Sequence, residues 1–289
     1  MQAGTTGARR PMTVAFALSG GANLGPMQAG SAAALLDAGI QPDLLVGTSV
    51  GALNAAFMAC RPGAGGVAAL RTAWAGLRRR DAFRFNLAGA VAGFVGVRPH
   101  LVSTGRMQAL VRRWVTVERI EECPIRFAAV ATDALTGEPV VLDRGELLPA
   151  LLASSAIPGL LPPVRVGRRW LVDGSLAAGC PVLQAQDLGA ETVYMISTGT
   201  APRVAPPRGA VAMAMHSVSL LTSRSNDSQL RLARERAAGH AGAVLVVPPA
   251  QPEAPSPFDF RHSRSLYMLA YERTSAWLAD GMPVPTSYG

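Results

Sequence analysis

The sequence predicts an α/β protein of three layers, with helices on both faces of a mostly parallel central sheet. Short apolar runs of strand length alternate with longer helical runs along most of the 289 residues. Two glycine-rich turns each stand between a predicted strand and a predicted helix, as at the carboxyl edge of a parallel sheet. Because 49% of the residues are hydrophobic, a chain of this length can bury a large core.

The expected elements follow from this alternation. Strands are expected at 13–18, 43–47, 125–131, 138–142, 169–172, 191–197 and 243–248. Helices are expected at 26–38, 50–60, 66–78, 105–115, 145–154, 181–188, 209–238 and 262–280. We expect one domain over 12–282, a candidate lid at 76–104, a flexible N-terminus at 1–11 and a C-terminal tail at 283–289.

The segment 43–60, DLLVGTSVGALNAAFMAC, carries the strongest functional signal. Gly47-Thr48-Ser49-Val50-Gly51 is a G-x-S-x-G sequence between a strand and a run of good helix formers, the context of a nucleophile elbow. Such a turn exposes the serine hydroxyl above the positive end of a helix, where negative charge is stabilised. We therefore interpret Ser49 as a nucleophile. The alternative is an ordinary strand-to-helix turn that Thr48 or Ser49 caps.

A second glycine loop, Ser19 to Gly25, follows the first predicted strand. Glycines let backbone N–H groups approach a ligand, so the loop fits either a phosphate cradle or an oxyanion hole. A dinucleotide site would need a third glycine where Ala22 stands. A P-loop would need a lysine, and this chain contains none. The oxyanion hole is the better interpretation, because the serine turn supplies an anion for these donors to stabilise.

A third element, Trp170-Leu171-Val172-Asp173-Gly174, ends an apolar run with Asp-Gly. This dipeptide alone predicts a turn. The order of glycine loop, G-x-S-x-G and late Asp-Gly, however, resembles the patatin-like phospholipase family. The resemblance covers roughly 12–280, and its matching segments are LSGGANLGPMQAG at 18–30, GTSVGALNAAF at 47–57, ATDALTGEPVVL at 131–142, ASSAIPGLLPPV at 153–164 and RWLVDGS at 169–175.

The resemblance implies a hydrolase of lipid carboxylic esters that uses a Ser–Asp dyad without a histidine, a metal or a cofactor. Ser49 would be the nucleophile and Asp173 the base, whose pKa partial burial would raise toward a useful value. The oxyanion donors would be backbone N–H groups of the glycine loop. The residues involved would be Gly20, Gly21 and Ala22 in the oxyanion hole, with Gly25, Gly47, Gly51 and Gly174 supporting the motifs.

Two departures from the family pattern bear on activity. Ala22 replaces the third glycine of the loop, and its N–H remains usable only where the backbone avoids positive φ. Leu24 stands where the family commonly has a cation, which puts recognition of a phospholipid head group in doubt. The family's Asn-x-Pro after Asp-Gly is here reduced to the proline, Pro181. A weakened or specialised activity is consistent with these changes.

Two rival interpretations remain open. An α/β-hydrolase triad would run Ser49, Asp173, then His240 or His262, although the elbow comes very early in the chain for that fold. His100 and His216 are the other histidines. Alternatively, the fold persists as a lipid-binding or scaffolding protein without activity.

Charge and cysteine content suggest partners and compartment. The formal charge of +8 fits an anionic membrane surface or nothing specific, whereas no nucleic-acid module is present. Arg78 to Arg80 beside the apolar stretch 87–97 make the lid segment a candidate for membrane contact. The alternative, a core-packed helix with a solvated basic start, is the favoured interpretation. Cys60, Cys123 and Cys180 are expected to be reduced, buried thiols.

Without a signal peptide or transmembrane run, we expect a cytoplasmic location, peripheral to the membrane if the protein binds lipid. The oligomeric state is not predicted.

Overall fold

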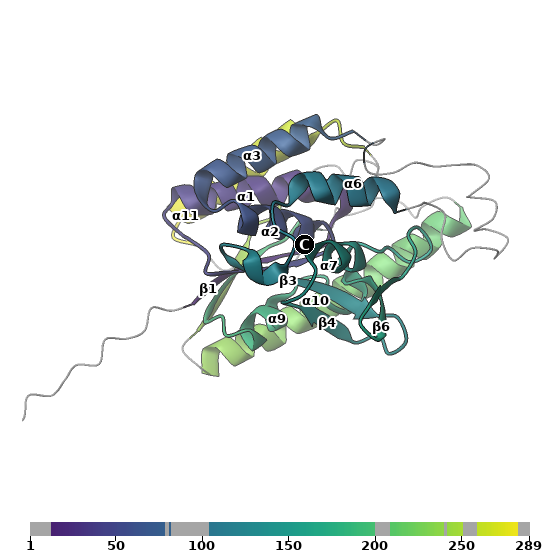
Figure 1. The fold of residues 1–289 in the computed structure, drawn as a ribbon. Coiled ribbons are helices and arrows are strands. Elements are labelled where there is room, and N and C mark those ends of the chain that lie inside the picture. Colours follow the sequence, from purple (N-terminus) through teal and green to yellow (C-terminus); the bar gives the residue numbers. More distant parts are fainter. Residues whose placement is uncertain are drawn as a thin grey trace, which may run out of the picture.

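The computed structural model describes residues 13–78, 81, 104–199, 209–239, 242–250 and 259–282 (Figure 1). Both chain ends and most of the candidate lid at 76–104 lie outside these ranges. None of the described helices is long and apolar enough to cross a membrane.

The centre of the protein is an eight-stranded sheet in the order β5-β6-β3-β2-β1-β7-β8, with β4 also paired to β3. Five strands run parallel, and the short strands β4, β5 and β6 are antiparallel to their neighbours. The strands are β1 (Val14–Leu18), β2 (Leu44–Thr48), β3 (Arg126–Asp133), β4 (Pro139–Leu142), β5 (Val164–Val166), β6 (Arg169–Asp173), β7 (Thr192–Ile196) and β8 (Ala243–Val247).

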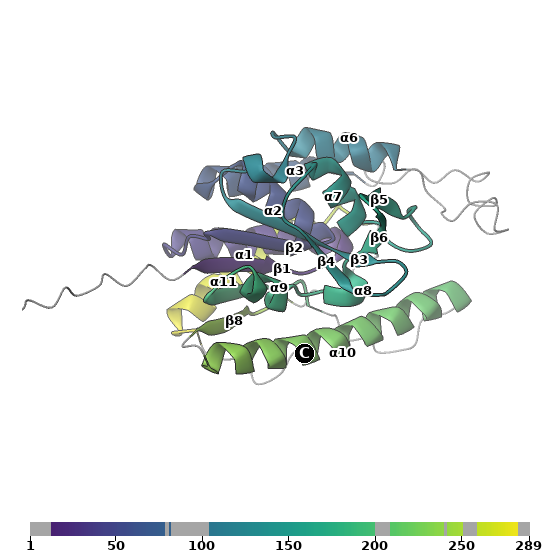
Figure 2. The ribbon, with the colours of Figure 1, turned by 60° about the horizontal axis from the view of Figure 1, so that its bottom comes forward.

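Helices cover both faces of this sheet, which gives the three layers expected (Figure 2). One face packs against α1 (Gly25–Asp37), α2 (Val50–Cys60), α3 (Gly63–Gly76), α6 (Gly105–Trp114), α7 (Leu147–Ser154) and α11 (Ser263–Ala279). The other packs against α8 (Ser175–Ala178), α9 (Val182–Asp187) and α10 (Ala210–Gly239). Two short 3-10 helices, η1 (Ala22–Leu24) and η2 (Ile120–Glu122), complete the described elements.

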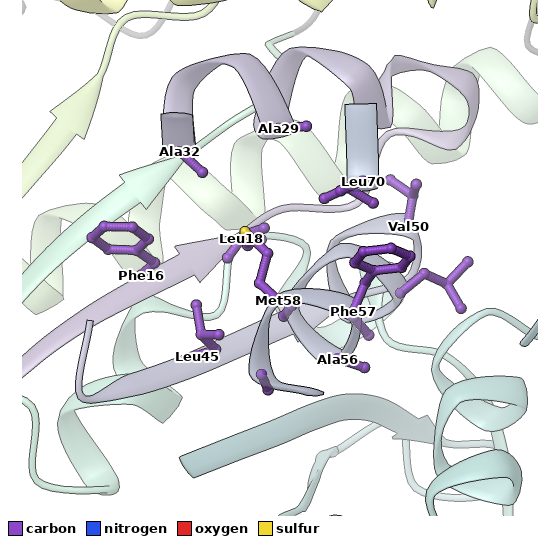
Figure 3. Packing of buried hydrophobic residues seen from close by; sticks show 14 of the residues in the cluster. Phe16, Leu18, Ala29, Ala32, Leu45, Val50, Ala56, Phe57, Met58 and Leu70 are labelled. Carbon is purple, nitrogen blue, oxygen red and sulfur yellow. The ribbon is translucent and has the colours of Figure 1, made fainter. Parts of the chain in front are cut away.

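Side chains of each central strand alternate between the two apolar layers. Phe16 and Leu18 of β1 point to the α2 side, and Ala15 and Ala17 point to the α9 side. The helix α2 is buried along its whole length, with Met58 near Leu18 and Phe57 near Leu70 (Figure 3). The residue that precedes α2 is therefore held by a rigid, fully packed element.

All of the expected strands and helices are confirmed, with ends shifted by a few residues. The helix expected at 66–78 begins at Gly63 and ends at Gly76. The structure adds β5 and α8, of three and four residues. Both elements are too short to give a periodic pattern of apolar residues in the sequence, so tertiary packing decides their conformation.

Candidate active site

Ser49 occupies the sharp turn between β2 and α2. Its backbone has φ 55° and ψ −124°, a conformation that residues with a side chain rarely adopt. A Cβ on Gly47 would overlap the carbonyl of Gly51, and a Cβ on Gly51 would overlap the carbonyl of Leu18. The two glycines of G-x-S-x-G are thus required by the close approach of β1, β2 and α2.

Ser49 Oγ donates a hydrogen bond to Asp173 Oδ2 over 2.7 Å. The two residues are 124 positions apart. β3 brings them together because β2 and β6 pair with consecutive stretches of it, residues 126–130 and 131–133. Val130 lies opposite Thr48, and Ala131 lies opposite Asp173. Ser49 is 7% exposed and Asp173 is 4% exposed, so their hydrogen bond is shielded from water.

The surroundings of Asp173 favour a basic carboxylate. Burial raises its pKa above the ordinary value, and hydrogen bonds from Ser175 and Ser49 oppose part of this effect. The Ser175 N–H donates to Asp173 Oδ1 over 2.8 Å, which fixes the orientation of the carboxylate. A Cβ on Gly174 would overlap the Val130 carbonyl, so the Asp-Gly pair packs against β3. The carboxylate is thus held against the Ser49 hydroxyl, and its pKa is raised by burial.

The glycine loop passes directly beside Ser49, as expected. A Cβ on Gly20 would overlap Ser175 Oγ and would lie 3.6 Å from Ser49 Cβ. The structure differs from the expectation at one donor, because the Gly20 N–H already donates to the Gly179 carbonyl over 2.9 Å. Within the described residues, no acceptor takes the N–H of Gly21 or of Ala22. Of the three expected oxyanion donors, Gly21 and Ala22 are therefore the ones whose N–H groups are not engaged by another described residue.

The backbone of Ala22 is also different from the expectation. Its φ is 49°, in the left-handed region that disfavours residues with a Cβ. The expected link between positive φ and loss of this donor is therefore wrong, because the Ala22 N–H has no acceptor among the described residues although its φ is positive. The loop keeps the glycine-type conformation although an alanine occupies it.

A buried polar network behind the loop was not foreseen. Gln28 Nε2 donates to the Ser19 carbonyl over 2.7 Å, and Asn54 Nδ2 donates to Gln28 Oε1 over 2.9 Å. Trp74 Nε1 donates to Asn54 Oδ1 over 2.8 Å. A Cβ on Gly25 would overlap the Trp74 ring, so the supporting glycine belongs to the same contact. The only sequence signal is a polar side chain in each of two otherwise apolar helices.

Among the described residues, no hydrogen bond links His262 of the rival triad to Ser49 or Asp173. His262 Nε2 lies 3.6 Å from Asp259 Oδ2, and its side chain is 54% exposed. His216 belongs to α10. His100 and His240 lie outside the described residues.

All three cysteines are free thiols, but not all of them are buried as expected. Cys60 and Cys180 are buried, whereas Cys123 is half-buried. Cys60 Sγ lies 4.0 Å from Cys123 Sγ, a proximity that their separation of 63 positions conceals. Within the ranges that the structure describes, no three His, Cys, Asp or Glu side chains cluster as metal ligands.

The fold and the serine turn together define a three-layer α/β/α protein with a nucleophile elbow on its parallel sheet. The sequence profile of the patatin-like phospholipase family matches residues 16–185, a span that contains the glycine loop, Ser49 and Asp173. The chain belongs to the patatin-like phospholipase family.

Individual relatives share part of the chain. An uncharacterized NTE family protein of Mycobacterium tuberculosis is 32% identical over 170 residues, 58% of this chain and 27% of that protein. A putative patatin-like phospholipase domain-containing protein of Caenorhabditis elegans is 26% identical over 188 residues, 64% of this chain and 17% of that protein. The structure of VipD from Legionella pneumophila has a TM-score of 0.47 at 14% identity, covering 94% of this chain and 67% of VipD. This chain thus spans about a quarter of the length of the mycobacterial relative.

Proposed function

We propose that this protein is a serine acyl hydrolase that cleaves carboxylic esters of lipids through a Ser49–Asp173 dyad. The observation that carries the proposal is the buried 2.7 Å hydrogen bond from Ser49 Oγ to Asp173 Oδ2. Membership of the patatin-like phospholipase family supports the reaction class. Retention of Ser49 and Asp173 speaks against a purely lipid-binding role, because neither side chain packs the core.

In the proposed reaction, Asp173 takes the hydroxyl proton as Ser49 Oγ attacks the ester carbonyl carbon. The carbonyl oxygen gains negative charge and accepts hydrogen bonds from the N–H groups of Gly21 and Ala22. Collapse of this intermediate expels the alcohol, which takes the proton from Asp173 and leaves an acyl group on Ser49. Water then attacks the acyl group with Asp173 again as base, which releases the acid and restores Ser49.

The site supports an ester as the substrate, but it does not define the head group of that ester. Leu24 removes a cation that could meet a phosphate, so we place no requirement for a phosphate on the substrate. A neutral ester and a phospholipid are both compatible with the dyad. No cofactor enters the proposed reaction.

The nucleophile is tested with a fluorophosphonate probe on the purified protein. We expect one covalent label, located at Ser49 by peptide mapping. The Ser49→Ala variant should lose both the label and turnover of short-chain p-nitrophenyl esters, with an unchanged melting temperature. Turnover near the wild-type rate in this variant would show that Ser49 is not the nucleophile. An unlabelled and inactive wild-type protein that is folded would support the lipid-binding interpretation.

Histidine variants separate the dyad from a triad. We expect His240→Gln and His262→Gln, singly and together, to change turnover by less than about tenfold, or ~1.4 kcal/mol of barrier. A triad histidine would instead cost orders of magnitude. A thousandfold loss of turnover in either variant, with an unchanged melting temperature, would mean that the histidine and not Asp173 is the base.

A further inference from the structure

The turn region around β5 and β6 carries an exposed aromatic and an exposed aliphatic side chain. Trp170 is 48% exposed and Leu135 is 85% exposed. The other three tryptophans, Trp74, Trp114 and Trp277, are 3–5% exposed. A hydrogen bond from the Ala134 N–H to the Trp170 carbonyl over 2.8 Å holds the two exposed side chains on adjacent segments.

This region lies beyond the edge of the sheet at which the candidate active site stands. Asp173 pairs with Ala131, and Leu171 pairs with Asp133, the last residue of β3. Trp170 therefore lies past the carboxyl end of β3. It precedes Asp173 by three residues of the same strand, about 10 Å at ~3.3 Å per residue. Both β5 and β6 lie on the side of the molecule away from α11 (Figures 1 and 2).

Three arginines belong to the same β5–β6 hairpin as Trp170. Arg165 of β5 is the cross-strand partner of Trp170, and Arg168 and Arg169 follow in the β5–β6 turn and at the start of β6. All three are exposed. Arg165 Nε donates only to the Gly167 carbonyl, over 3.3 Å. No ion pair links any of the three to a carboxylate within the described parts of the chain.

We propose that these five residues form a docking surface for an anionic lipid bilayer, with Leu135 and Trp170 entering the interface and the three arginines meeting the head groups. The proposal rests on the proposed function and gives it a mode of substrate access. Tryptophan places its ring and N–H at the boundary of apolar and polar regions, which a bilayer interface provides. Arginines without an ion-pair partner among the described residues add electrostatic attraction to an anionic surface.

A bilayer fits this surface better than nucleic acid or a protein partner. Binding of single-stranded nucleic acid uses successive aromatic platforms along a basic groove, and here one aromatic side chain stands on a turn. A bilayer also explains the position, because contact at this edge brings lipid esters toward Ser49 and Asp173. The partner that this surface fits is therefore a lipid bilayer.

The test uses the full chain with Ser49→Ala, so that binding is measured without hydrolysis. Phosphatidylcholine vesicles with and without phosphatidylglycerol are sedimented with the protein. We expect binding to the anionic vesicles only, weakened by added salt. Lipids with brominated acyl chains should quench tryptophan fluorescence, and Trp170→Phe should remove this quenching because the other three tryptophans are buried.

Two double variants with the same change in net charge show whether vesicle binding depends on this surface or on net charge alone. Arg165→Glu with Arg168→Glu should weaken vesicle binding at least tenfold. Arg264→Glu with Arg273→Glu makes the same charge change on exposed positions of α11 and should alter binding by less than about twofold. Equal losses in both pairs, binding without quenching at Trp170, or no binding to anionic vesicles would each overturn the proposal. If anionic vesicles bind as expected but the wild-type protein hydrolyses no ester, the proposed function is overturned and the docking surface is not.

Discussion

Ser154 Oγ accepts a hydrogen bond from the Ser49 N–H over 2.9 Å and donates one to the Val130 carbonyl over 2.6 Å. This single hydroxyl links the serine turn to β3 and to the end of α7. The φ of Ser49 is 55°, and such a conformation costs of order 1–3 kcal/mol and persists only where surrounding contacts enforce it. Ser154 supplies one of these contacts.

We expect Ser154→Ala to lower both stability and turnover. The variant leaves the Ser49 N–H and the Val130 carbonyl buried without this partner, at about 1–3 kcal/mol. The Ser49 turn loses a support, so kcat should fall more than KM changes. Melting curves and ester hydrolysis measure the two effects.

The neighbouring serine provides the control. Ser155 is 5% exposed, and its hydroxyl has no hydrogen-bond partner among the described residues. Ser155→Ala should therefore leave turnover near wild type and stability unchanged or slightly higher. Equal behaviour of the two variants would mean that the Ser154 hydrogen bonds do not support the turn.

Asp173→Asn should abolish hydrolysis and raise stability at neutral pH. Turnover should fall by several orders of magnitude because the proposed base is gone. Burial raises the pKa of Asp173, so above this pKa the folded protein bears the cost of a buried charge that asparagine does not have. We expect a higher Tm for Asp173→Asn than for the wild-type protein at neutral pH, measured by thermal melting.

The pH dependence of this gain has a definite sign. As pH falls through the raised pKa, the folded wild-type protein takes up a proton at Asp173 and regains stability. The Tm difference between variant and wild type should therefore shrink toward acid pH. Wild-type turnover should fall over the same range. An exposed acid, Asp187, is the control, and Asp187→Asn should show neither trend. A difference that grew toward acid pH would contradict a buried, uncompensated carboxylate.

Much of the fold follows from the sequence because β1, β2 and β7 are fully buried strands that alternate with long helices. Their apolar runs and glycine-rich ends are visible without a structure. β5 has three residues, and its pairing with β6 depends on partners distant from any local pattern. Sequence reasoning therefore found the parallel centre of the sheet and the antiparallel strands β4 and β6, and it missed the edge strand β5.

The site divides in the same way. Ser49 and Asp173 stand at the ends of predicted strands, so the motif order was enough to select them. The engaged N–H of Gly20 depends on Gly179, a residue 159 positions away, and no spacing rule reports it. The positive φ of Ala22 is likewise set by packing. An alanine in the sequence predicts the opposite backbone region.

We expect Ala22→Gly to stabilise the protein. Relief of the left-handed alanine is worth about 1–2 kcal/mol, and the extra freedom of glycine in the unfolded chain offsets about 0.4–1 kcal/mol. The net gain should be roughly 0.5–1 kcal/mol by denaturant unfolding. Ala33→Gly in the middle of α1 is the control and should destabilise, because that alanine is helical. A loss of stability in Ala22→Gly would show that the loop relaxes around alanine.

The thiol pair leads to a prediction about reactivity. The pKa of Cys60 is lowered to about 6, mainly because the Cys123 thiol donates a hydrogen bond to its thiolate, with further contributions from Thr116 and Arg61. The same hydrogen bond raises the pKa of Cys123. Because the thiolate is the reactive form, iodoacetamide at neutral pH should alkylate Cys60 in preference to Cys123.

The pH profile of this alkylation tests the cause as well as the shift. The rate at Cys60 should rise with pH through an inflection near 6, whereas an ordinary thiol has its inflection at about 8.5. Cys123→Ala removes the thiol donor and should move the inflection upward. Cys180→Ala should leave it in place, because Cys180 belongs to the apolar layer on the other face of the sheet. An inflection that did not move in Cys123→Ala would assign the lowered pKa to Thr116 and Arg61, since these are the other groups that favour the Cys60 thiolate.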